Sequence, residues 1–105
     1  MYDADAPRIP RELLELGVPV LGICYGMQLV ADLLGGKVGR SEDREYGVAS
    51  IRGQWGSPLF LGIEEFRHGM GIPVWMSHGD RIERLPEGFS AIARSGSSPV
   101  AAMSN

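Results

Sequence analysis

The sequence predicts an α/β domain with a largely parallel core sheet, and three observations carry that prediction. The first third of the chain has the pattern of a helix, a buried strand and a second helix, an order that favours parallel strands. Residues 18–23 form a continuous apolar run rich in β-branched side chains, which is typical of a strand covered on both faces. At 105 residues, the chain is long enough for one folded domain and too short for two.

The elements of the first third follow from local signals. A short helix is expected over residues 10–16, because Pro10 suits the first position of a helix and Gly17 can end one. The second helix is expected over residues 25–34, where apolar residues repeat at helical spacing until Gly35.

Beyond the second helix the signals become shorter and strand-like. A capped helical turn is expected at residues 57–60, where Ser57 precedes Pro58. A charged loop is expected at residues 40–45, between the first two strands. Short apolar or alternating segments predict strands at residues 37–38, 48–51, 73–76, 89–93 and 100–103.

Composition excludes several classes of protein. With 44% hydrophobic and 22% charged residues, the chain has the make-up of a soluble globular protein. A net charge of −3 without a basic block argues against nucleic-acid binding. The uncharged run over residues 17–31 is too short to span a membrane, and the acidic start is unlike a signal peptide. The single Cys excludes a disulfide framework or a multi-cysteine metal site, so we expect a cytoplasmic protein.

The sharpest chemical feature is Cys24, which Gly22 and Gly26 flank at the predicted junction of strand and helix. A nucleophile on such an elbow projects from a strained turn, and small neighbours let the backbone approach closely. The helix N-terminus favours a thiolate, and the N–H of Tyr25 can face an oxyanion. The alternative is a buried, inert cysteine, the usual fate of a free thiol. The two flanking glycines favour the nucleophile.

A cysteine nucleophile needs a histidine to accept its proton, and the chain has two. His68 lies in a polar, glycine-rich stretch and is expected in an exposed loop. His78 follows a predicted strand and either shapes a turn or contacts substrate. Their separation gives no metal-site spacing. Gln28 lies one helical turn after Cys24, so it either neighbours the thiol or fills an ordinary helix position.

Residues 20–29, Val-Leu-Gly-Ile-Cys-Tyr-Gly-Met-Gln-Leu, strongly resemble the nucleophile segment of class I glutamine amidotransferases. The Cys-Tyr-Gly-Met-Gln version is similar to that of the GMP synthase subfamily. Residues 44–47, 57–60 and above all 74–80, Val-Trp-Met-Ser-His-Gly-Asp, agree with it. The resemblance covers essentially the whole chain and implies a three-layer, flavodoxin-like domain with a mostly parallel sheet.

The resemblance implies a glutaminase that needs no cofactor of its own. Cys24 would attack the side-chain amide of L-glutamine, the Tyr25 N–H would face the oxyanion, and Gly22 and Gly26 would form the elbow. The residues that would hold the amino-acid end of the substrate are Gln28, Ser77, His78, Gly79 and Asp80. The released ammonia would pass to an ATP-pyrophosphatase (synthetase) module, which uses ATP and Mg²⁺ to convert xanthosine monophosphate to GMP.

Three parts of the family's proteins do not occur in these 105 residues. They are the His-Pro-Glu motif that supplies the general base, the early Gly-Gly loop that supplies a second oxyanion donor, and the synthetase module. We therefore expect a domain that is incomplete at both ends. Three alternatives stay open: a glutaminase of carbamoyl-phosphate or aminodeoxychorismate synthesis, a non-catalytic fragment, and a redox-sensing cysteine.

Overall fold

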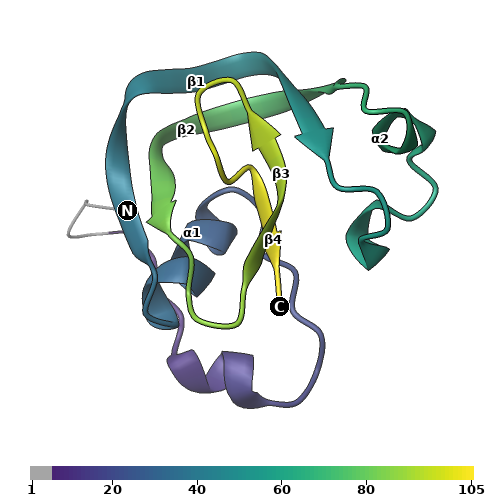
Figure 1. The fold of residues 1–105 in the computed structure, drawn as a ribbon. Coiled ribbons are helices and arrows are strands. Elements are labelled where there is room, and N and C mark those ends of the chain that lie inside the picture. Colours follow the sequence, from purple (N-terminus) through teal and green to yellow (C-terminus); the bar gives the residue numbers. More distant parts are fainter. Residues whose placement is uncertain (1–5) are drawn as a thin grey trace.

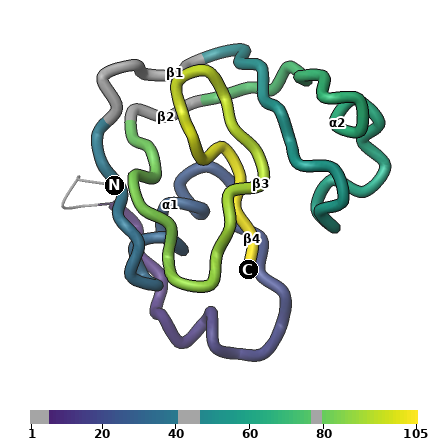
Figure 2. Tube along the Cα trace, in the orientation of Figure 1, coloured from purple at the N-terminus to yellow at the C-terminus, as the bar shows by residue number. Residues whose placement is uncertain are grey.

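The computed structural model describes residues 6–105, apart from the side chains of residues 41–46 and 77–79 (Figure 2). Its elements, with η marking a 3₁₀ helix, are η1 (Arg11–Glu15), α1 (Tyr25–Leu33), β1 (Lys37–Gly53), η2 (Pro58–Phe60), α2 (Glu64–Arg67), β2 (Ile72–Arg84), β3 (Ser90–Ser95) and β4 (Ala102–Ser104). No helix among the described residues is long and apolar enough to cross a membrane.

The four strands form one sheet in the order β2-β1-β3-β4, and each neighbouring pair is antiparallel (Figure 1). β1 pairs with β2 along most of its length, and its last residues pair with β3. The largely parallel sheet predicted from the sequence is therefore not the arrangement of the described strands. The connection between β1 and β2 holds only η2 and the four-residue α2. This connection, residues 54–71, is long enough for a crossover, but neither of its helices is long enough to cover a face of the sheet as the helix of a parallel crossover does, so it suits the antiparallel return that is observed.

The predicted strand at residues 18–23 is the main difference between expectation and structure. This segment is not a strand, and no described strand pairs with it. Its apolar side chains face solvent, with Leu21 68% and Ile23 72% exposed. An apolar run forms a strand only where a neighbouring strand satisfies its backbone groups, and the described sheet lies elsewhere.

Most other predictions hold in place but differ in extent. The second helix is confirmed as α1, whereas the first is the short 3₁₀ helix η1. The two strands expected around a charged loop are parts of the single strand β1. η2 lies at the predicted helical turn, although the Ser57 side chain makes no capping hydrogen bond there. α2 was not predicted, because its four residues are too few for a periodic pattern.

Two clusters of buried side chains hold these elements together. One joins β1 and β3 to η2 and α2, and its Phe60 and Phe66 rings pack edge to face with centroids 4.8 Å apart. The other packs Ala31 of α1 against Ile82 of β2. α1 is thus fixed on the sheet, and with it the turn that precedes the helix.

Two polar contacts fasten the segment before η1 to α1. Arg8 forms an ion pair with Asp32, with the nitrogen and oxygen 2.7 Å apart, and the Tyr25 hydroxyl donates to the Pro7 carbonyl at 2.7 Å. The hydrogen bond to Asp32 raises the pKa of the Arg8 guanidinium. The segment that precedes the exposed residues 18–23 is therefore fastened to α1, the helix that follows them.

Candidate functional site

Cys24 occupies a strained turn immediately before α1. Its φ of 56° and ψ of −114° make it the one non-glycine residue with positive φ in the described part of the chain. Such a conformation costs about 1–3 kcal/mol and persists only where the surroundings enforce it. Here the Cys24 carbonyl accepts hydrogen bonds from the N–H groups of Met27 at 3.1 Å and Gln28 at 3.4 Å. The turn leaves the Cys24 residue exposed, at the position expected for a nucleophile elbow.

The N–H of Tyr25 is available beside the thiol. Tyr25 is the first residue of α1, and its N–H has no acceptor among the described residues. The next N–H, that of Gly26, donates to the Ile23 carbonyl at 2.9 Å. A free N–H at a helix N-terminus can stabilise negative charge that develops on a substrate oxygen.

The two glycines of the elbow have different surroundings. A Cβ on Gly22 would lie 2.7 Å from the carbonyl carbon of Gly26 and 2.9 Å from the nitrogen of Met27, too close for any side chain. A Cβ on Gly26 would meet nothing within 4 Å. The close backbone approach in the elbow therefore excludes a side chain at Gly22, whereas Gly26 has room for one.

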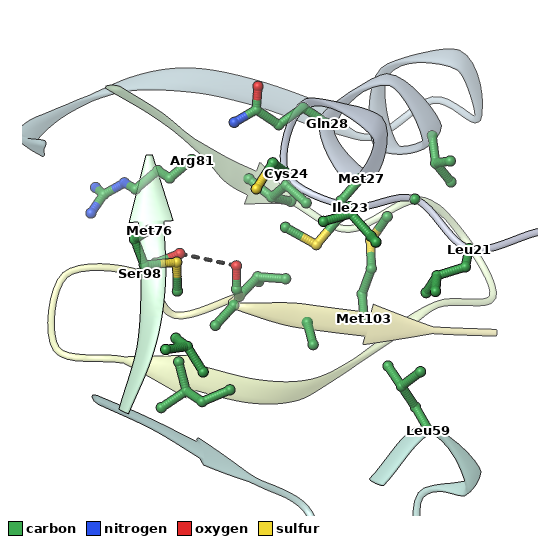
Figure 3. Close-up of a pocket in the computed structure, with 18 of the residues that line it drawn as sticks. Leu21, Ile23, Cys24, Met27, Gln28, Leu59, Met76, Arg81, Ser98 and Met103 are labelled. Carbon is green, nitrogen blue, oxygen red and sulfur yellow. Dashed lines mark hydrogen bonds between the residues drawn. The ribbon is translucent and has the colours of Figure 1, made fainter. Parts of the chain in front are cut away.

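A cavity of about 310 Å³ lies beside Cys24. Figure 3 shows Met27, Met76 and Met103 gathered around it, with Leu21 and Leu59 at one side. Its volume is at the lower end for small-molecule sites, and its walls are mostly apolar, as is usual for such sites. Met103 reaches the cavity only because β4 pairs with β3, so no local sequence pattern could have identified it.

Several polar side chains around this cavity donate hydrogen bonds to backbone carbonyl groups of the protein. Gln28 is buried, and its Nε2 donates to the backbone carbonyl of Asp80 at 3.4 Å. The Ser98 hydroxyl donates to the Val100 carbonyl at 3.0 Å, the contact drawn dashed in Figure 3. Arg81, which the sequence did not single out, donates to the Ser97 carbonyl at 3.3 Å. Gln28 therefore links α1 to β2.

The predicted residues of the 77–80 segment are described only in part. Asp80 is half-buried, lines the same cavity as Cys24 and Gln28, and has an interaction partner. The side chains of Ser77 and His78, and the surroundings of Gly79, lie outside what the structure describes. His68 is exposed after α2, as expected, and does not line the cavity. Within the described part of the chain, no cluster of three or more His, Cys, Asp or Glu side chains could hold a metal ion.

Comparison with known proteins gives the same family as the elbow. The model of the class I glutamine amidotransferase family matches residues 2–105. The GMP synthase (glutamine-hydrolysing) of Maridesulfovibrio salexigens is 54% identical over 105 residues, which are 100% of this chain and 20% of that protein. The GMP synthase of Azoarcus sp. is 51% identical over 108 residues, covering 100% of this chain and 21% of that protein. The chain thus spans about a fifth of the length of these relatives.

Solved structures support the same fold. A glutamine amidotransferase from Methylobacillus flagellatus superposes with a TM-score of 0.72 at 26% identity, over 90% of this chain and 36% of the other. One from Thermotoga maritima has a TM-score of 0.67 at 30% identity, over 82% of this chain and 35% of the other. Fold, elbow and sequence agree, and the chain belongs to the class I glutamine amidotransferase family.

Proposed function

We propose that this chain is the glutaminase part of a GMP synthase and that Cys24 is its nucleophile. The observation that carries the proposal is the strained Cys24 turn with the free N–H of Tyr25 beside it. Relatives about 50% identical along the whole chain carry the name GMP synthase, which supports this choice of pathway. The synthetase module, with its ATP and Mg²⁺, is the proposed partner, and L-glutamine is the substrate.

The reaction follows from the chemistry of the elbow. The Cys24 thiolate attacks the side-chain amide carbon of glutamine, so a C–S bond forms and the carbonyl oxygen becomes an oxyanion that accepts a hydrogen bond from the Tyr25 N–H. Collapse of this intermediate breaks the C–N bond, and the nitrogen leaves as ammonia with a proton from the general acid–base histidine of the family. Water then hydrolyses the thioester to glutamate and restores the thiol. One oxyanion donor is typically worth about 10²–10³ in rate.

The amino-acid end of glutamine is proposed to bind near Gln28 and the 77–80 segment. The hydrogen bond from Gln28 to the Asp80 carbonyl supports a role for Gln28 in holding that segment in place. Ser77, His78, Gly79 and Asp80 are then the proposed contacts to substrate. The half-buried position of Asp80 beside the Cys24 cavity supports its place among them.

In a protein that contains further strands of the family domain beside them, residues 18–23 are proposed to form the predicted parallel strand. Their apolar, β-branched composition and their exposure support this, because such a segment gains by pairing and burial. This arrangement would place Cys24 at the carboxyl end of a strand, where active sites of α/β folds occur. The free thiol suits a reducing cytoplasm, which is the proposed location.

Covalent labelling of the full-length parent protein tests the role of Cys24. We expect an electrophilic glutamine analogue to label Cys24 much faster than an alkylator of similar size and reactivity without the amino-acid end, with the site read by mass spectrometry. Excess L-glutamine should protect it, and Cys24→Ala should remove the label. Equal rates with both reagents, or a label on another residue, would contradict the proposal.

A second assay distinguishes the pathways. The parent protein should aminate xanthosine monophosphate in the presence of glutamine, ATP and Mg²⁺, and Cys24→Ala should abolish this with glutamine but not with free ammonia. Amination of another acceptor instead would favour a different glutaminase. The 105-residue chain alone is expected to show little or no Cys24-dependent ammonia release, because loss of a positioned general base typically costs about 10²–10⁴ in rate.

A further inference from the structure

Two arginines on the sheet differ from every other described arginine. The side chains of Arg52 and Arg94 make no hydrogen bond or ion pair with any described residue. The others all have partners: Arg8 pairs with Asp32, Arg11 with Glu15 and Arg67 with Glu64, Arg81 and Arg84 donate to carbonyl groups, and Arg40 is also engaged. Among the described arginines, only these two, both on the sheet, therefore have a side chain without a partner.

The two unpaired arginines are direct neighbours. Arg52 of β1 lies opposite Arg94 of β3 in the antiparallel register, so both side chains project from the same face. Residues directly opposite each other have Cβ atoms about 4.5–5.5 Å apart, and like charges in such a pair destabilise a sheet. The adjacent pair, Gly53 and Ala93, faces the opposite side, where Gly53 meets the Phe66 ring. The arginines thus lie on the solvent face, behind the hydrophobic core.

A hollow of about 320 Å³ lies over this pair. It is lined by Ser50, Arg52, Arg94, Ser95 and Gly96, and no carboxylate takes part. Ser50 is two residues before Arg52 on the same strand, so its hydroxyl is on the same face. Ile51, between them, lines the Cys24 cavity instead. The hollow and the Cys24 cavity are therefore on opposite faces of β1.

We propose that Arg52 and Arg94 bind a phosphate-class oxyanion in this hollow. A guanidinium donates two parallel hydrogen bonds to such an anion, and two guanidinium groups can share one dianion. A dianion neutralises both charges and removes the repulsion between them, whereas a single carboxylate neutralises only one. No other described arginine is unpaired, so the site fits one phosphoryl group, not a nucleic-acid backbone. The proposal is independent of the chemistry at Cys24.

Titration with inorganic phosphate tests the site. We expect saturable shifts in the NMR signals of the Arg52 and Arg94 side chains and of their strand neighbours, with potassium chloride at equal ionic strength as the control. Arg52→Gln and Arg94→Gln should each weaken binding at least fivefold, and the double variant should abolish it. Arg67→Gln, which removes an exposed arginine paired with Glu64, is the matched control and should leave binding unchanged. Phosphate shifts that persist in the double variant would overturn the proposal, and so would the absence of saturable binding.

Three further measurements test the need for a dianion, the source of the anion and the repulsion between the two arginines. Acetate should bind at least tenfold more weakly than phosphate, and equal binding would contradict the dianion argument. A nucleoside monophosphate that binds more tightly than phosphate would identify a nucleotide as the source, and equal binding would identify free phosphate. At low salt without phosphate, either single variant should raise the thermal unfolding midpoint, because it relieves the like-charge pair. A midpoint that falls would contradict the proposed repulsion.

Discussion

Residues 18–23 and the core cluster around Phe66 both consist mostly of apolar side chains, yet the first lies in solvent and the second is buried. Ile23 is 72% exposed, whereas Phe66 is 3% and Ile92 is 5% exposed. The two regions differ in neighbours more than in composition: β1 has β2 on one side and β3 on the other, while residues 18–23 pair with no described strand. The contrast shows that an apolar pattern reports a capacity for burial, and that the partner decides whether burial occurs.

Cys24 lies at the boundary between these two regions. On its C-terminal side α1 is packed on the sheet through Ala31 and Gln28, which are both buried. On its N-terminal side the chain is exposed. The hydrogen bonds that hold its strained turn come from α1. The conformation of the nucleophile is therefore fixed by the packed region, and predictions can be made for each side.

The largest expected effect compares the two regions directly. Phe66→Ala should lower the free energy of unfolding by about 3–5 kcal/mol, because it empties a buried site and removes the edge-to-face contact with Phe60. Ile23→Ala should change it by less than about 0.5 kcal/mol, since that side chain is already exposed. Urea denaturation of the 105-residue chain measures both.

If Phe66→Ala does not fold at all, Phe66→Leu provides the graded measurement, with an expected loss of at least about 1 kcal/mol. Equal effects at Phe66 and Ile23 would contradict the contrast. The same Ile23→Ala change made in a longer protein, where strands flank residues 18–23, should become clearly destabilising.

The next effect concerns the two glycines of the elbow. Gly22→Ala should destabilise by about 1–3 kcal/mol, because its methyl group would collide with the backbone of Gly26 and Met27, and it should slow Cys24 labelling. Gly26→Ala should be neutral or stabilising by up to about 1 kcal/mol, because the site is open and alanine favours helix. Denaturation and labelling rates compare the pair. A larger loss of stability for Gly26→Ala than for Gly22→Ala would contradict this prediction, because the crowded position would then follow Cys24 and not precede it.

Local patterns predicted the part of the fold that local interactions determine. α1 followed from its apolar repeat and Gly35, and the turn at Cys24 followed from the two glycines. The antiparallel sheet did not follow, since the pairing of β1 with β3 joins residues some forty positions apart. The length of β1 was also missed, because charged residues within it suggested a loop.

The candidate site shows the same division. Cys24, Tyr25 and Gln28 belong to one short segment, so sequence reasoning could propose all three as candidates. Met76 and Met103 reach the cavity through strand pairing, and the hydrogen bond of Gln28 to Asp80 joins residues from different elements. Predicting those contacts requires the register of the sheet, which no single segment encodes.

A smaller effect tests how the first residues are fastened to the packed region. Tyr25→Phe removes the hydroxyl that donates to the Pro7 carbonyl and should cost about 0.5–1 kcal/mol, because a half-exposed hydrogen bond contributes modestly. The loss should be independent of salt, since no charge is involved. Phe89→Tyr, which adds a hydroxyl without removing a contact of α1, is a control for the general effect of changing an aromatic side chain. An effect of Tyr25→Phe above about 2 kcal/mol would mean that this contact supports more than the segment before η1.

The smallest effect is expected at the ion pair of Arg8 and Asp32, which fastens the same segment by charge. Both side chains are nearly half exposed, so water screens them and the gain from pairing is small. Asp32→Ala should therefore lower the unfolding midpoint by less than Tyr25→Phe does. In 1 M NaCl, where the screening length is about 3 Å, this difference from the unsubstituted protein should vanish, whereas that of Tyr25→Phe should persist. Denaturation at low and high salt measures both variants side by side. A salt-independent loss at Asp32 would contradict this, because it would show that the hydrogen bond from Arg8, and not the attraction between the charges, makes the contribution of this pair.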